Sequence, residues 1–351
     1  SLVLARMRGI VNPIMQGVSA LTVLIVIWYG GIRVMRGDLL VADIVAFIAY
    51  LNILAWPTAA FGWMLSLVER GRAAMKRLDE ILDAPPEITG PPAPLRVRGL
   101  KSGVEFRNVS FSYGHSNNGH SALDDVSFTL PVGKTVGLVG RIGSGKSTVA
   151  QLLPRLFDVS SGEILVDGQD IRRLSLHELR RMIGCVPQDP FLFSTSLRRN
   201  LTFGRDEVSD AEVERAVSIA KLDRDLEIFP QGIETIVGER GVTLSGGQKQ
   251  RATLARALVM DPPVLILDDC LSSVDAQTEA EILHGLKAIL REKTCLIISH
   301  RISAVKEADE ILVLDGGRVI ERGSHEQLIR REGVYADLYR QQRLSEELEQ
   351  I

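Results

Sequence analysis

The sequence predicts two folding units that need different solvents: a pair of membrane-spanning helices, followed by an α/β domain. Three observations predict this fold class. Two long uncharged stretches lie near the N-terminus, a proline-rich segment follows them, and strand-like and helical patterns follow in the remainder. The length of 351 residues is about twice that of one typical domain. Hydrophobic residues at 45% and charged residues at 24% exclude a disordered chain.

The two N-terminal spans are predicted from the distribution of charge. Residues 9–32 and residues 44–68 are stretches of 24 and 25 residues without a charged side chain. As a helix, each stretch would be roughly 36 Å long, which is enough to cross a bilayer core. We expect spans near residues 10–32 and 43–68, with the second helix continuing into the cytoplasm through Leu82. Two buried helices of a soluble protein are the alternative, but such helices rarely stay uncharged over this length.

Basic residues flank the outer ends of these spans: Arg6, Arg8, Arg70, Arg72, Lys76 and Arg77. The positive-inside rule therefore places both outer ends, and the domain that follows, in the cytoplasm. We expect a multi-pass protein of the cytoplasmic (inner) membrane, with the lipid bilayer as a partner. Because the chain starts at Ser1 rather than at a methionine, we expect it to be a fragment of a longer protein.

A proline-rich segment marks the boundary between the two parts. Residues 84–94 hold five of the 14 prolines, and proline fixes φ and removes a hydrogen-bond donor. We therefore divide the chain into a membrane part at 1–83, a linker at 84–100 and a second domain at 101–351. The net charge of −3 lacks the basic excess of a general nucleic-acid binder. Three well-separated cysteines argue against a disulfide-rich secreted protein and against a zinc ribbon.

The strongest local signal in the second domain is a glycine-rich loop. Residues 135–139 form an apolar, strand-like run, and residues 148–156 have a helical pattern. Between them the sequence fits GxxxxGK[ST] with Gly140, Arg141, Ile142, Gly143, Ser144, Gly145, Lys146, Ser147 and Thr148. In such a loop, successive backbone N–H groups converge on phosphates. Lys146 is expected to reach the β- and γ-phosphates and Ser147 to hold Mg²⁺, so the loop predicts a nucleotide site.

A second apolar run, Val264–Leu267, ends in Asp268 and Asp269. A carboxylate at the C-terminal end of a strand can hold the shell of Mg²⁺, and the next residue can face the attacking water. Two ordinary acidic residues on the protein surface would give the same pattern, so the run by itself is weak evidence for a metal site. Beside a glycine-rich loop it predicts Asp268 as a metal ligand and Asp269 as a catalytic residue.

A third motif points to a family. The run Leu244-Ser245-Gly246-Gly247-Gln248 opens a helical pattern at 249–259 and lies between the glycine-rich loop and the two aspartates. In this order the motifs resemble those of ATP-binding cassette (ABC) proteins. The resemblance implies a P-loop NTPase cassette, an α/β fold with a RecA-like core and a helical subdomain, that uses ATP and Mg²⁺. It also implies that two cassettes pack head to tail, with Ser245, Gly246, Gly247 and Gln248 binding the ATP held by a partner.

The same resemblance assigns roles to residues between the motifs. Tyr113 looks like the aromatic residue that stacks on adenine. Gln188 looks like the glutamine that contacts Mg²⁺ and water, and His300 looks like the switch histidine. With these two residues, Lys146 and Asp269 complete the expected catalytic set.

Three other segments receive an interpretation. Residues 272–275 resemble the D-loop of the family, and residues 237–241 resemble the segment that contacts the membrane domain of exporters. His115 and His120 lie in a Ser/Asn/Gly-rich stretch, where no spacing or partner supports a metal.

The resemblance covers the whole chain and implies a subunit of an exporter. Residues 1–83 resemble the last two helices of a six-helix membrane domain, and residues 101–351 resemble a complete cassette. ATP-driven closing and opening of a cassette pair would then drive alternating access for a small molecule, a lipid or a peptide. No nucleic-acid partner is expected.

One residue departs from the family pattern, because Asp269 stands where Glu is usual. An aspartate carboxylate is set back by about 1.5 Å, and a misplacement of about 1 Å can cost on the order of 100-fold in rate. We therefore expect slow hydrolysis at this site and a heterodimer in which the intact signature serves a partner. The retained His300 keeps open a homodimer in which Asp269 works as a base. A regulatory cassette that binds ATP as a structural clamp is a further alternative, and the two spans disfavour a soluble cassette of DNA repair or translation.

Overall fold

The computed structural model describes residues 2–97, 99–114, 121–205, 207–238 and 244–349. The chain separates into two compact units, Ser1–Pro86 and Glu87–Ile351. His115, His120 and residues 239–241 of the expected membrane-contact segment lie outside the described residues.

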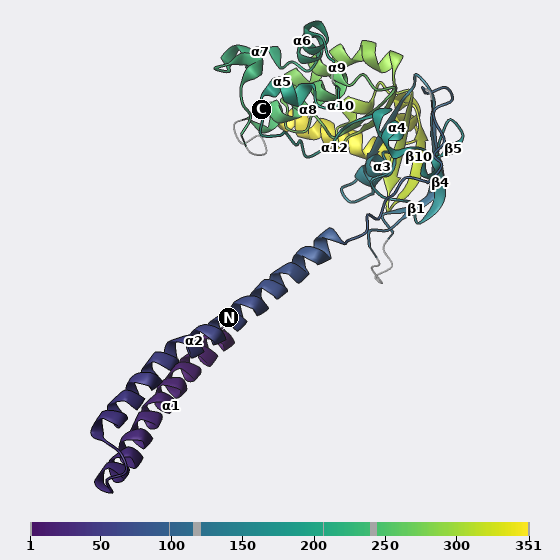
Figure 1. Cartoon of the computed structure of the whole chain (residues 1–351). Coiled ribbons are helices and arrows are strands. Elements are labelled where there is room, and N and C mark those ends of the chain that lie inside the picture. Colours follow the sequence, from purple (N-terminus) through teal and green to yellow (C-terminus); the bar gives the residue numbers. More distant parts are fainter. Residues whose placement is uncertain (1, 98, 115–120, 206, 239–243, 350–351) are drawn as a thin grey trace. The chain divides into compact units, whose positions relative to one another are not determined.

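The N-terminal unit is a hairpin of two long helices, α1 (Leu2–Met35) and α2 (Val41–Leu82) (Figure 1). A Cβ added at Gly30 would approach the Ile44 side chain to 3.0 Å. Because small residues let helix backbones approach each other, Gly30 accounts for the close packing of the two helices at this point.

Helix α2 agrees with the second predicted span. Among the described residues it is the one helix that is long and apolar enough to cross a membrane, whereas the apolar stretch Ala20–Met35 of α1 is shorter. Helix α2 also continues without interruption to Leu82, as expected from its charged second half. The first stretch is helical, and its crossing of a membrane stays a prediction.

A six-stranded sheet forms the centre of the C-terminal unit, in the order β10-β9-β3-β8-β7-β6. Its strands are β3 (Thr135–Gly140), β6 (Ile183–Val186), β7 (Val264–Asp268), β8 (Thr294–Ile298), β9 (Glu310–Asp315) and β10 (Arg318–Gly323). All neighbours pair in parallel except β10, which is antiparallel to β9. Parallel strands end at one edge of a sheet, so the segments after β3, β7 and β8 meet there.

A smaller antiparallel sheet has the order β2-β1-β4-β5. Its strands are β1 (Val104–Phe111), β2 (Leu123–Leu130), β4 (Ser161–Val166) and β5 (Gln169–Asp170). Phe106 of β1 and Phe128 of β2 are directly opposite and stack at 4.5 Å between ring centroids. Both rings are buried, so this pair joins the small sheet to the core beneath it.

The strands of the large sheet divide their side chains between two cores. Along β7, Val264 and Ile266 join the core shared with the small sheet, whereas Leu265 and Leu267 join the core beneath the helices. This alternation follows from the two-residue period of a strand. A continuous apolar run is typical of strands that are covered on both faces.

Helices enclose the large sheet. Four of them, with one 3₁₀ turn, lie between β6 and β7 in the sequence: α5 (Leu197–Leu201), α6 (Asp210–Ile219), α7 (Asp223–Ile228), η2 (Gly232–Glu234) and α8 (Gly246–Val259). The others are α3 (Lys146–Leu152), η1 (Ile171–Arg173), α4 (Leu176–Arg181), α9 (Ala276–Glu292), α10 (Ile302–Val305), α11 (His325–Arg330) and α12 (Val334–Glu349). The fold is the expected α/β P-loop NTPase cassette with a helical subdomain.

Candidate nucleotide site

The glycine-rich loop (Gly140–Thr148) connects the fully buried strand β3 to helix α3. Gly145, which has φ of +98°, precedes the first helical residue. A Cβ at this position would lie 2.3 Å from the carbonyl oxygen of Ala122. Only glycine combines this left-handed backbone with so close an approach, so Gly145 sets the path of the loop.

Lys146 is the first residue of α3, and its side chain turns back over the loop. Its Nζ donates to the carbonyl oxygens of Gly140 at 2.9 Å and Arg141 at 2.8 Å, and Ser144 Oγ lies 3.4 Å away. Burial lowers the pKa of Lys146, while the charges of Asp269 and Asp268 raise it. The ammonium group is therefore held against the backbone of the loop that would bind a phosphate.

Ser147 and Asp268 meet at the end of β7. Ser147 Oγ donates to Asp268 Oδ1 at 3.2 Å. Burial raises the pKa of Asp268, the hydrogen bond from Ser147 lowers it, and the neighbouring Asp269 raises it again. One hydroxyl and one carboxylate, with phosphate oxygens, form the oxygen donor set that Mg²⁺ prefers. The described residues hold no cluster of three His, Cys, Asp or Glu side chains that could bind a metal.

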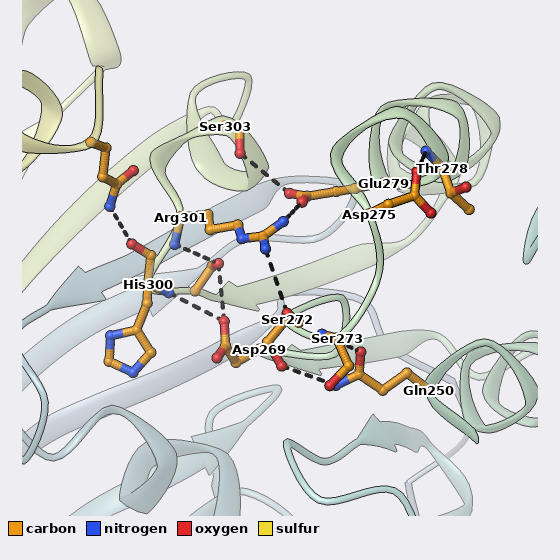
Figure 2. A network of polar contacts seen from close by, with 12 residues as sticks. Gln250, Asp269, Ser272, Ser273, Asp275, Thr278, Glu279, His300, Arg301 and Ser303 are labelled. Carbon is orange, nitrogen blue, oxygen red and sulfur yellow. Dashed lines mark hydrogen bonds and ion pairs between the residues drawn. The ribbon is translucent and has the colours of Figure 1, made fainter. Parts of the chain in front are cut away.

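Asp269 lies next to the segment that follows β8. Its Oδ1 accepts hydrogen bonds from Ser299 Oγ and from the backbone N–H of His300, both at 3.3 Å (Figure 2). Its backbone is left-handed, with φ of +45°. Burial and the charge of Lys146 lower the pKa of His300, whereas Asp269 raises it. The Asp269 carboxylate is thus held against the backbone of His300, and the catalytic roles of both residues stay predictions.

Tyr113 lies beside the start of α3. Its hydroxyl is 3.1 Å from Thr148 Oγ1 and donates to Gln151 Oε1 at 2.8 Å. Phe111 and Phe157 contact the ring in edge-to-face geometry, at 4.8 and 5.4 Å between centroids. Tyr113 is 45% exposed, which leaves surface for stacking on a base.

Gln188 is the fourth residue of the expected catalytic set. It follows β6, which pairs in parallel with β7, so it belongs to the same edge of the sheet as Asp268. Its side chain is exposed, and within the described part of the chain it has no hydrogen bond. A contact between Gln188 and Mg²⁺ therefore stays a prediction.

The signature segment (Leu244–Gln248) starts helix α8. Ser245 is its N-cap, with Oγ accepting from the Gln248 backbone N–H at 3.2 Å and Gln248 Oε1 accepting from the Ser245 N–H at 2.9 Å. This capping box satisfies two donors at the helix start and leaves other N–H groups free to face an anion. Gly246 is exposed, and a Cβ at Gly247 would lie 3.0 Å from the Ser273 carbonyl oxygen. The signature segment therefore packs closely against the D-loop.

Two family models match this chain. The model for the ABC transporter covers residues 123–272, and the model for the ABC transporter transmembrane region covers residues 1–58. The chain belongs to the ABC transporter family. Tyr113 and His300 lie outside the first matched range, so their placement rests on the geometry described above.

Several relatives resemble this ABC chain over nearly all of its length. A "Probable multidrug resistance ABC transporter ATP-binding/permease protein" of Bacillus subtilis (strain 168) is 41% identical over 335 residues, covering 95% of this chain and 56% of the relative. An "ATP-dependent lipid A-core flippase" of Burkholderia thailandensis is 38% identical over 333 residues, covering 95% of this chain and 55% of the relative.

A solved structure agrees with these relatives. The structure of a bacterial Atm1-family ABC exporter with ATP bound superposes with a TM-score of 0.74 at 39% identity, covering 87% of this chain and 53% of that protein. The chain thus spans about half the length of the proteins it matches.

The structure also shows polar contacts around the ABC motifs that no motif predicts. Gln250 of α8 donates from Nε2 to Ser272 Oγ at 3.0 Å and accepts from the Ser273 N–H at 2.9 Å, which joins the signature helix to the D-loop. Asp225 of α7 binds Arg251 at 2.6 Å and Gln248 at 2.9 Å. These partners are 22 to 26 residues apart, so no local pattern could pair them.

Proposed function

We propose that the chain binds and hydrolyses ATP as one subunit of an exporter of the cytoplasmic membrane, and that its own site hydrolyses ATP slowly. One observation carries the ATPase part of the proposal. Three parallel strands, β3, β7 and β8, end at one edge of the sheet. The residues at these ends are Lys146 and Ser147 after β3, Asp268 and Asp269 at β7, and His300 after β8, and hydrogen bonds join Ser147 to Asp268 and His300 to Asp269.

Each group at this edge has a separate task in the proposal. The N–H groups of the glycine-rich loop and Lys146 bind the phosphates of ATP. Ser147 and Asp268 would hold Mg²⁺, which neutralises charge on the phosphates when bound. Asp269 orients the water and accepts its proton, and His300 donates a hydrogen bond toward the leaving phosphate. The resemblance to the family is the source of these roles, and the geometry supports them.

The position of Asp269 supports slow hydrolysis. Its side chain is one methylene shorter than the glutamate usual in the family. Both hydrogen bonds to its Oδ1 come from Ser299 and His300, so the carboxylate is tied to the segment after β8. A base held back by about 1 Å can lose on the order of 100-fold in rate. ATP binding would be unaffected, because the glycine-rich loop does not depend on Asp269.

The chain combines a slow ATP site of its own with an intact signature segment, and this combination suggests a partner cassette. The signature segment has a complete capping box and an exposed N-terminus, so it can bind the phosphate of an ATP held by another subunit. We favour a heterodimer in which the partner supplies a faster site, and opening of the pair drives alternating access. The names of the relatives support a small molecule or a lipid as the exported substrate, and the family resemblance adds peptides.

The decisive experiment compares ATP binding and phosphate release by the whole chain in lipid nanodiscs, with Mg²⁺, for the unmodified chain and Asp269→Glu. We expect tight binding by both proteins and turnover on the order of 100-fold higher for Asp269→Glu, because the longer side chain restores the position of the base. Asp269→Asn is the matched control, and it should remove the residual turnover.

The possible outcomes separate the alternatives. No gain in Asp269→Glu would contradict the positioning argument. Brisk turnover by the unmodified chain would instead favour a homodimer with Asp269 as a working base. ATP binding without turnover in either protein would favour the regulatory clamp.

A further inference from the structure

The C-terminal helix α12 reaches the switch segment (Ser299–Ile302) through one side chain. Gln342 Oε1 accepts a hydrogen bond from the backbone N–H of Ile302 at 2.8 Å, and Gln342 Nε2 donates to the carbonyl oxygen of His300. One amide group therefore holds the backbone on both sides of Arg301. Gln342 lies 40 residues after Ile302, so this contact is a product of the tertiary fold.

The bond to Ile302 has a structural reason. Helix α10 starts at Ile302, and its N-cap residue, Arg301, is extended and provides no side-chain cap. The first N–H groups of a helix have no partner within the helix. Gln342 supplies the missing acceptor from another element, and its amide nitrogen then reaches the carbonyl of His300.

The side chain of Arg301 is held by other elements, α9 and the D-loop, rather than by α12. Its guanidinium donates to the carboxylate of Glu279, which is only 4% exposed, and its Nη2 lies 3.5 Å from the carbonyl oxygen of Ser272 (Figure 2). Ser303 Oγ adds a bond of 3.2 Å to Glu279. The switch segment is thus bound by α9 and the D-loop through Arg301, and by α12 through Gln342.

His300 is the residue between these restraints. Its N–H donates to Asp269, and its carbonyl accepts from Gln342, so both backbone polar groups of His300 are bound by side chains from other elements. The direction of the imidazole depends on this peptide, because a side chain leaves the backbone at an angle set by its own peptide planes.

We propose that Gln342 is a positioning residue for ATP hydrolysis, which fixes the backbone of His300 so that the imidazole faces the phosphate held by the glycine-rich loop. This inference rests on the proposed ATPase function. It assigns to α12 a role at the site that acts through the backbone of His300.

The test uses the whole chain in nanodiscs with three variants. Gln342→Ala removes both hydrogen bonds, and Gln342→Glu keeps an acceptor for the Ile302 N–H but faces the His300 carbonyl with an oxygen. Gln341→Ala is the matched control, because Gln341 is an exposed glutamine at the next position of the same helix. Two measurements are made: steady-state kcat and KM for ATP, and hydrogen exchange of the switch segment without nucleotide.

For Gln342→Ala we expect kcat to fall about tenfold, with KM for ATP within about twofold of the unmodified chain. Exchange of the Ile302 amide should become about tenfold faster. Gln342→Glu should lower kcat to a similar extent while keeping the Ile302 amide protected. This variant therefore separates the effect of the hydrogen bond to His300 from that of the hydrogen bond to Ile302. Gln341→Ala should match the unmodified chain in both measurements.

Three results would overturn the proposal: unchanged kcat in Gln342→Ala, unchanged exchange of the switch segment, or faster exchange throughout β7 and β8, which would indicate general destabilisation. Failure of the ATPase function is distinguishable, because the unmodified chain would then show no turnover, while hydrogen exchange would still report whether Gln342 restrains the switch segment.

Discussion

Gly145 and Gly143 both have left-handed backbone in the glycine-rich loop, at φ of +98° and +81°. Their surroundings differ, because a Cβ at Gly145 would lie 2.3 Å from the Ala122 carbonyl oxygen, whereas no atom lies within 4 Å of a Cβ at Gly143. A left-handed alanine costs roughly 1–2 kcal/mol at either position, and at Gly145 the loop must also move. We therefore predict that Gly145→Ala lowers the melting temperature of the nucleotide-free chain clearly more than Gly143→Ala does. Equal shifts would mean that the contact with Ala122 relaxes without cost.

At the same scale, the glycine-rich loop was recognisable from the sequence, because a phosphate-binding loop needs glycine, lysine and a hydroxyl at fixed short spacings. In the structure the Asp269 carboxylate accepts a hydrogen bond from the His300 backbone N–H, and the catalytic roles of the two residues stay predictions. The sequence did not predict the left-handed backbone of Asp269, or the contacts of Glu279, Arg301 and Gln342. These contacts join residues 22 to 42 positions apart, and their geometry exists only after the chain has folded.

Two helices show how local chemistry sets the limits of an element. Helix α8 was expected from residue 249 and starts at Gly246, because Ser245 and Gln248 form a capping box that satisfies the first N–H groups. Helix α3 was expected to continue to residue 156 and ends at Leu152, because Pro154 has no N–H with which to continue the helical hydrogen bonds. The hydrophobic pattern predicted both helices, and caps and proline determined where they end.

Helix α8 is also braced by the ion pair of Arg251 with Asp225 of α7, whose side chains are 12% and 13% exposed. Arg251 Nε has no partner among the described residues, so loss of Asp225 would leave a buried cation with little compensation. We predict that Asp225→Ala lowers the free energy of unfolding by about 3 kcal/mol, measured by urea titration.

A surface pair on α12 provides the matched control for this prediction. Arg343 and Glu347 form an ion pair at 3.0 Å with side chains that are 61% and 60% exposed. Glu347→Ala should cost less than about 0.5 kcal/mol, because water screens an exposed pair. A loss of similar size in both variants would show that the Asp225–Arg251 pair contributes no more than a surface contact.

At the scale of the whole chain, the two units differ in what covers their apolar side chains. Helix α2 has no buried residue in the structure, and its large apolar side chains need lipid or further helices around them. The C-terminal unit, in contrast, buries two apolar clusters of its own. The composition of residues 84–94 predicts a boundary there, because proline removes hydrogen-bond donors, and the structure separates two compact units between Pro86 and Glu87.

A truncation series tests this independence. Residues 87–351 should be soluble without detergent, melt cooperatively and bind ATP, because both apolar clusters of the C-terminal unit remain complete. Residues 133–351 should aggregate, because this shorter chain lacks β1 and β2 and so uncovers the face on which Phe106 and Phe128 are buried. Solubility and melting are measured for both fragments at equal concentration. If residues 87–351 also require detergent, the C-terminal unit depends on the membrane helices for its stability, and ATP binding and export cannot then be assigned to separate units of the chain.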